Sequence, residues 1–213
     1  MKAHDLTRTV ESGMTVYPDD PAVSVSEHAN MPEDSYRVKR LDCGSHSGTH
    51  VDAPSHTEPD GATIDEFPVE RFALDAVVAD CRGLDARAPI GPEHLPATDA
   101  DVLVVRTGWE THWGTAAYRD HPYLTPATAD FCLENGYDVA VDALNPDPTP
   151  TPRADSDEPD GFPVHHRLLG NDRLIFENLT GLEAVPDRFE LLAFPLKLAA
   201  GDGAPVRAVA RYE

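Results

Sequence analysis

The sequence predicts a mixed α/β fold in which short strands outnumber helices. Short β-like runs recur along the chain, and 20 prolines and 14 glycines are scattered between them. Only one segment carries clear signals for both the start and the end of a helix. The length of 213 residues suits one domain, residues 1–213, with a sizeable core, and no internal repeat is apparent.

The strand candidates are β-branched or apolar runs bounded by turn signals. Near the start, residues 14–21 (MTVYPDDP) and 23–26 (VSVS) alternate short β-like runs with turns. Residues 35–43 (SYRVKRLDC) alternate apolar and charged side chains, which predicts a half-buried strand. Further strands are expected at residues 74–81, 102–107, 139–142, 174–176, 191–194 and 206–210.

Helices are fewer, and one long loop interrupts the chain. Residues 125–136 predict a helix, because a proline stands near the start and a glycine at the end. A single turn is expected at residues 91–95 and a short helix at 164–169. Residues 145–161 (NPDPTPTPRADSDEPDG) hold five prolines and five acidic side chains, so we expect an exposed loop within the domain.

The charge of the chain narrows the range of partners. With 38 acidic against 17 basic side chains, the net charge is −21, which disfavours both nucleic acid and an anionic membrane surface. The acidic excess is scattered, and we interpret it as a halophile-type surface whose repulsion molar salt would screen. Neither a membrane-spanning run nor a signal-peptide pattern is present, so we expect a soluble cytoplasmic protein. The three cysteines are far apart and indicate neither disulfides nor a thiolate zinc site.

Residues 45–56 (SHSGTHVDAPSH) concentrate possible metal ligands. His46, His50, Asp52 and His56 all stand at even positions, so an extended segment would point them to one side. Three imidazoles and one carboxylate without a thiolate suit zinc, manganese or ferrous iron. The alternative is a set of surface histidines on an irregular loop.

A second group of polar residues lies in residues 165–179. Glu177 follows the apolar triplet Leu174-Ile175-Phe176, where a buried strand end would carry its carboxylate into the interior. An unpaired carboxylate is costly there, so a cation is a reasonable partner, although a surface position is equally compatible with the pattern. The residues alone do not distinguish His165 from His166 as a ligand.

The segment SHSGTHVDAPSH closely resembles the HxGTHxDxPxH motif of the metal-dependent cyclase family, which includes bacterial kynurenine formamidases and isatin hydrolases. Residues 14–21 are similar to the family's substrate loop, and residues 139–148 to its segment after the central strand. Residues 165–179 match its His…LL…Glu-Asn-Leu block, and residues 201–208 its terminal Gly-Pro-Val-Arg block. The resemblance thus covers nearly the whole chain.

The resemblance implies a role for each matching position. His46 and His50 would hold one metal, Asp52 and Glu177 would bridge two, and His56 would be the catalytic acid/base. Because the family's second-metal histidine precedes the distal glutamate by twelve residues, His165 rather than His166 would be that ligand. Tyr17 would contact the substrate. The implied fold is a swivelling-type α/β domain with a barrel-like β core, usually assembled as a homo-oligomer, here a dimer or tetramer.

The implied activity is metal-dependent hydrolysis of a C–N bond in a formamide or cyclic amide, as in an arylformamidase. One or two divalent ions, zinc or manganese, would activate water, and the partner would be a small-molecule amide. Tyr17 and Asp19 stand where kynurenine formamidases usually have tryptophan and glycine, which leaves the particular substrate open. The alternatives are a metal- or small-molecule-binding module without turnover, and a non-haem iron oxygenase that uses His50, Asp52 and a distant histidine.

Overall fold

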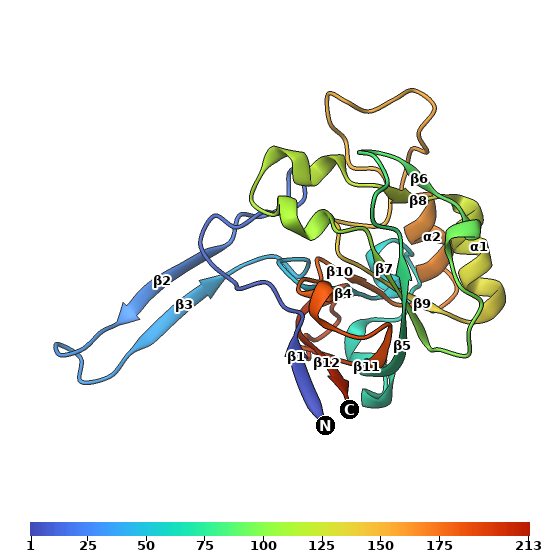
Figure 1. The fold of residues 1–213 in the computed structure, drawn as a ribbon. Helices are drawn as coiled ribbons and strands as arrows, with labels where there is room; N and C mark the ends of the chain where they lie inside the picture. Colours follow the sequence, from blue (N-terminus) through green and yellow to red (C-terminus); the bar gives the residue numbers. More distant parts are fainter.

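Seven strands close into a barrel because β4, at one end of an eight-stranded sheet, also pairs with β12, the strand next to the other end. They are β4 (His50–Asp52), β5 (Ala73–Asp80), β7 (Val102–Arg106), β9 (Asp138–Val141), β10 (Ile175–Glu177), β11 (Arg188–Pro195) and β12 (Gly203–Tyr212). Neighbours follow the order β12-β11-β5-β7-β9-β10-β4, and β4 pairs in turn with β12. β1 (Lys2–Asp5) lies beside the far end of β12. The computed structural model describes all 213 residues and confirms the predicted α/β fold with a barrel core (Figure 1).

Strands β7, β9 and β10 bury both of their faces, whereas β5, β11 and β12 alternate buried with more exposed residues. β5, β7, β9 and β10 run parallel, and all five residues of β7 are buried. Alternate residues of β7 join two different hydrophobic clusters, one of 22 and one of 17 buried residues. The second cluster includes residues of both α-helices, which lie next to each other against one side of the barrel (Figure 1). Burial on both faces explains why β7 begins with the continuous apolar run Val102–Val105.

Helix α1 (Pro126–Asn135) has the termini that its sequence predicts. The Thr125 side chain accepts a hydrogen bond from the Thr128 N–H, and Gly136 ends the helix with a positive φ of 79°. Helix α2 (Pro163–Leu169) confirms the short helix expected at residues 164–169. Short 3₁₀ turns occupy Pro54–His56, Ile64–Glu66, Val69–Phe72, Pro92–His94, Trp109–His112, Ala116–Asp120 and Leu182–Ala184. None of these helices combines the length and apolar character that a membrane crossing requires.

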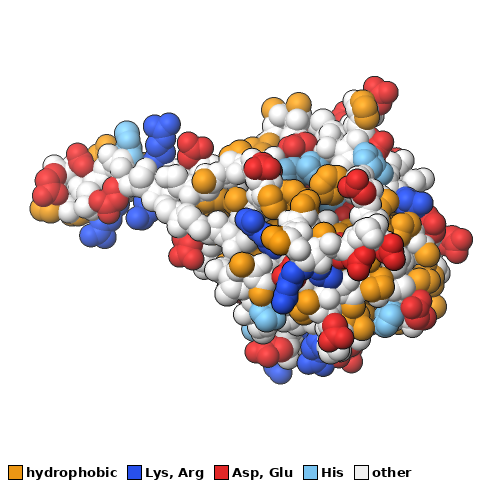
Figure 2. Space-filling view, turned by 90° about the horizontal axis from the view of Figure 1, so that it is seen from above, with side chains coloured by type: hydrophobic (Ala, Val, Ile, Leu, Met, Phe, Trp, Pro, Cys, Tyr) orange, Lys and Arg blue, Asp and Glu red, His pale blue; other side chains and the backbone are white.

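Two small sheets lie outside the barrel. β6 (Pro89–Ile90) pairs with β8 (Tyr123–Leu124), and β2 (Ser24–Ala29) pairs with β3 (Val38–Asp42). The β2–β3 hairpin projects from the body as an arm (Figures 1 and 2). The prediction of a strand within residues 35–43 is confirmed, but the prediction that it is half-buried is wrong, because all five residues of β3 are exposed. Its apolar residues alternate as expected, but no element of the body covers either face.

The loop at residues 145–161 is only partly exposed, which corrects the expectation of an exposed loop throughout. Asn145, Asp147 and Thr149 are buried, at 3%, 1% and 1% exposure. The Asn145 amide donates to the Thr149 hydroxyl at 2.8 Å, and the buried His121 ring contacts the same hydroxyl at 2.9 Å. These polar contacts hold the first residues of the loop inside, whereas residues 152–157 face solvent.

Candidate metal centre

Strand β4 and the turn before it form the first group of possible ligands. Asp52 is fully buried, and its Oδ1 lies 2.7 Å from His46 Nδ1 and 3.1 Å from His50 Nε2. The opposite nitrogen of His50 contacts the Gly48 carbonyl oxygen at 2.9 Å. Since a carbonyl can only accept, Nδ1 carries a proton, and Nε2 is the nitrogen that faces the cluster and is available to a cation.

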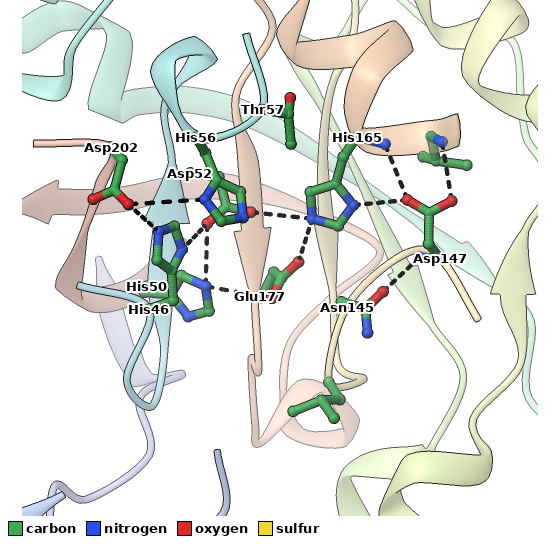
Figure 3. A network of polar contacts seen from close by, with 12 residues as sticks. His46, His50, Asp52, His56, Thr57, Asn145, Asp147, His165, Glu177 and Asp202 are labelled. Carbon is green, nitrogen blue, oxygen red and sulfur yellow. Dashed lines mark hydrogen bonds and ion pairs between the residues drawn. The ribbon is translucent and has the colours of Figure 1, made fainter. Parts of the chain in front are cut away.

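Strand β10 brings the second group against the first. It pairs antiparallel with β4 so that Glu177 stands opposite His50, and Glu177 Oε2 lies 3.3 Å from His50 Nε2. His165 on α2 points its Nε2 to within 3.2 Å of Glu177 Oε1 and 3.5 Å of Asp52 Oδ2. Asp52 therefore belongs to two groups of possible ligands, one with His46 and His50, the other with His165 and Glu177 (Figure 3).

The donor set fits one or two divalent cations. His50 Nε2, Asp52 Oδ2 and Glu177 Oε1 are buried and make no well-aligned hydrogen bond, only the charge contacts of 3.1 to 3.5 Å given above. Buried polar atoms without a hydrogen bond are costly, and here they converge from two strands that are far apart in the chain, β4 and β10. Nitrogen and carboxylate donors at this spacing suit zinc or manganese, and a cation would satisfy all three atoms.

The charges of the cluster also favour a bound cation. Burial by itself would lower the pKa of His46, but the Asp52 charge and hydrogen bonds to Asp202 and Asp52 raise it to about 9. Burial opposes the charge of His50 and His165 as well, yet the facing carboxylates raise both pKa values well above the usual range. Burial would raise the pKa of Asp52, but the neighbouring histidines hold it well below its usual range. The carboxylates thus attract positive charge, which protons or a metal can supply.

His56 lies at the rim of this cluster, on the 3₁₀ turn Pro54–His56. Its side chain is one-third exposed, and its ring centroid lies 3.9 Å from that of His46. Burial, the largest influence, lowers the pKa of His56, so its imidazole is neutral and able to accept a proton at pH 7. Asp202 contacts both rings, with Oδ2 at 3.1 Å from His46 Nε2 and 3.9 Å from His56 Nδ1.

The cluster opens into a cavity of about 290 Å³. Tyr17 and Phe162 form an aromatic pair on its wall, with ring centroids 6.0 Å apart, and Asp20 also lines it. The Tyr17 hydroxyl is buried without a partner, and burial raises the pKa of Tyr17 to about 12. An aromatic wall beside a polar cluster suits a planar ring that carries a polar group.

The structure brings together the residues that the sequence singled out. His46, His50, Asp52, His56, His165 and Glu177 all line the cavity, as does Tyr17. His166 points elsewhere and contacts Glu58 at 2.8 Å with half of its side chain exposed. Strand alternation accounts for only part of this convergence. It puts His50 and Asp52 on one side of the three-residue strand β4, whereas His46 and His56 reach the cluster from a turn and a 3₁₀ turn.

Four residues at or next to the site were not predicted from the sequence. Phe162 and Asp20 line the cavity, and Asp202 and Asp147 each contact a histidine on the side away from the cluster (Figure 3). Asp202 stands in the Gly-Asp-Gly run of residues 201–203, which was the only sequence signal available. Asp147 and Phe162 lie in or beside a Pro-rich loop whose composition predicts solvent exposure.

The closed barrel and its histidine–carboxylate cluster define a class of α/β proteins whose aromatic-walled pocket contains side chains that could hold a metal ion. The model of the Cyclase family matches residues 4–148. The chain is 34% identical to the kynurenine formamidase of Salinibacter ruber over 97% of this chain and 96% of that protein. It is 34% identical to the kynurenine formamidase of Paracidovorax citrulli over 97% and 95% of the two chains. This chain belongs to the Cyclase family.

Solved structures share the fold over almost the whole chain. An isatin hydrolase bound to the product analogue thioisatinate superposes with a TM-score of 0.87 at 24% identity, over 98% of this chain and 91% of that one. A potential metal-dependent hydrolase with cyclase activity gives a TM-score of 0.75 at 26% identity, over 98% and 96%. The isatin hydrolase supports the fold, and the second structure adds a relative described as metal-dependent.

Proposed function

We propose that this protein is a metal-dependent hydrolase that cleaves the C–N bond of an aryl formamide or of a cyclic amide fused to an aromatic ring. The observation that carries the proposal is the convergence on the cavity wall of three buried atoms that make no hydrogen bond, on His50, Asp52 and Glu177. Relatives named kynurenine formamidase support an amide substrate. The aromatic pair Tyr17 and Phe162 supports an aryl group on that substrate.

Different residues of the cluster would bind the metal and transfer the proton. His46, His50, Asp52, His165 and Glu177 would hold one or two ions, zinc or manganese. When bound, the cation supplies Lewis-acid chemistry that makes water a nucleophile near neutral pH. His56 takes the proton from the attacking water and returns it to the leaving nitrogen. The water oxygen adds to the carbonyl carbon, the C–N bond breaks, and a carboxylate and an amine result.

Two other functions are compatible with parts of the site. An oxygenase of the two-histidine, one-carboxylate type would leave Glu177 without a role, although its carboxylate lies 3.3 Å from His50. A binding module without turnover would not need His56, which is neutral and stands at the cavity wall. Hydrolysis gives a role both to the five candidate ligands and to His56.

An activity screen tests the proposed reaction. The metal-loaded protein is incubated with aryl formamides, aryl-fused lactams and matching alkyl formamides, and the carboxylate and amine products are measured. We expect turnover of at least one aryl amide and weaker turnover of its alkyl counterpart, because only the aryl group can pack against Tyr17 and Phe162. A fully metal-loaded protein without hydrolysis across the panel would favour the binding module instead.

We also propose that the chain forms a homo-oligomer through the β2–β3 arm. Tyr36, Val38 and Leu41 are 56%, 42% and 53% exposed on this arm. Residues 36–41 (YRVKRL) form a basic stretch with three basic and no acidic side chains, whereas the rest of the arm carries Glu27, Glu33, Asp34 and Asp42 and the whole chain has a net charge of −21. A second copy of this acidic chain therefore offers the complementary charge as well as apolar surface.

Charge reversal on the arm tests this assembly. The double variant Lys39→Glu with Arg40→Glu should shift sedimentation towards the monomer and weaken association by at least about tenfold at low salt. Lys197→Glu, an exposed lysine outside the arm, is the control and should sediment like the unaltered protein. An unaltered protein that sediments as a monomer, or an arm variant that stays associated, would contradict the proposal.

A further inference from the structure

Each candidate ligand histidine has a partner on the side of its ring that faces away from the cluster. For His50 the partner is the Gly48 carbonyl, and for His46 it is Asp202, whose side chain is 46% exposed. For His165 it is Asp147, a carboxylate with 1% exposure. His165 is therefore the one histidine of the three that is fixed by a fully buried charge, and that charge comes from the loop at residues 145–161 (Figure 3).

Asp147 acts only as an acceptor in these contacts. Its Oδ1 accepts the Val164 backbone N–H at 3.0 Å, and its Oδ2 accepts the His165 backbone N–H at 3.0 Å. The same Oδ2 lies 2.7 Å from His165 Nδ1. Since backbone N–H groups can only donate, both carboxylate oxygens are used as acceptors, and the proton of the third contact belongs to Nδ1 of His165. Nε2 is then the ring nitrogen that faces Asp52 and Glu177 and is available to a cation.

We propose that Asp147 is a positioning residue of the metal centre, which holds the His165 ring by its Nδ1–H so that Nε2 binds the cation. It also links the centre to the Pro-rich loop, because the same carboxylate fixes the backbone of Val164 and His165 at the start of α2. The inference rests on the proposed metal-dependent function. It assigns a role to a loop whose composition alone suggests only solvated surface.

An isosteric amide at position 147 breaks this arrangement without removing volume. In Asp147→Asn one of the two oxygens becomes an NH₂ group, which must face a backbone N–H donor in either orientation. We expect the dissociation constant for one Zn²⁺ ion, measured by competition with a chromophoric chelator, to rise about 10- to 100-fold. The visible spectrum of the Co²⁺-loaded variant should change as well, because the His165 ring is no longer held in its orientation.

Asp157→Asn is the matched control, since it makes the same charge change at an exposed position of the same loop. It should bind Zn²⁺ and Co²⁺ as the unaltered protein does. Equal Zn²⁺ affinity and an unchanged Co²⁺ spectrum in Asp147→Asn would overturn the inference and leave the proposed function intact. An unaltered protein that binds no divalent ion would instead overturn the proposed function.

A measurement on the unaltered protein covers the case in which Asp147→Asn does not fold. In the Zn²⁺-loaded protein labelled with ¹⁵N, long-range ¹H–¹⁵N correlation spectra identify the protonated nitrogen of each histidine ring. We expect His165 to be protonated at Nδ1 and to bind zinc through Nε2. Coordination through Nδ1, or a His165 ring that does not bind the ion, would contradict the proposal.

Discussion

Replacing Asp52 with asparagine is expected to abolish metal binding at one or both ion positions and to lower hydrolysis by at least about a thousandfold, or about 4 kcal/mol of transition-state stabilisation. Asp52 has no exposed surface and belongs to two groups of possible ligands, one with His46 and His50 and one with His165 and Glu177. The amide removes the negative charge that both groups share. Metal content by elemental analysis and kcat/KM on the same sample are the measurements that check this result.

Asp60→Asn is the control for Asp52→Asn. Asp60 is exposed eight positions further along the chain, so the same loss of one charge should leave metal content and kcat/KM unchanged. Circular dichroism establishes that both variants are folded. An Asp52→Asn protein that keeps its full metal content and its rate would show that this carboxylate does not bind the cation.

His56→Ala should lower kcat by about 10²- to 10⁴-fold while the metal content stays at the level of the unaltered protein. The neutral imidazole stands at the rim of the cluster, where it can take a proton from water and pass it to a leaving nitrogen. The other geometric option is that His56 joins His46 and Asp202 as a ligand, because these three side chains also lie close enough to share an ion. Metal content separates the two roles, and kcat alone does not.

The control for His56→Ala is His166→Ala, which removes an imidazole that is half exposed and contacts Glu58 rather than the cluster. Its kcat and metal content should match those of the unaltered protein. If His56→Ala loses its metal together with its activity, His56 is a ligand. If it keeps full activity, a different group transfers the proton.

Local sequence signals predicted the elements that depend on neighbouring residues. The helix at residues 125–136 was predictable because Thr125 and Gly136 cap its two ends through contacts within a few residues. The strand at residues 102–107 was predictable because burial on both faces requires an unbroken apolar run. The two-residue strands β6 and β8 were not found, since they are too short to have a periodicity.

Features that depend on contacts between residues far apart in the chain could not be predicted from local sequence patterns. The barrel closes where β4 pairs with β12, about 150 residues apart in the chain, and no local pattern encodes that pairing. The alternation in residues 35–43 gave the strand correctly, but whether another element covers it depends on the rest of the fold. The burial of Asp147 likewise depends on α2, which follows it by about 16 residues and supplies two N–H donors.

The candidate site was predictable to the extent that one short segment carries it. His46, His50, Asp52 and His56 stand within eleven residues, so their composition alone indicated a cation site. The family resemblance was needed to select His165 over His166. The structure adds a physical reason, because only His165 faces Asp52 and Glu177. Asp202, Asp147 and Phe162 come from separate segments, and their proximity to the cluster is a consequence of the fold.

Metal removal and restoration test the central proposal most directly. The purified protein is stripped with a chelator, and aryl formamide hydrolysis is followed as Zn²⁺ or Mn²⁺ is added back, with bound metal counted on the same samples. The proposal predicts no hydrolysis in the stripped protein and a rate that rises with bound metal until one or two ions per chain are present. A stripped protein that is free of metal and still hydrolyses the substrate at the original rate would contradict it.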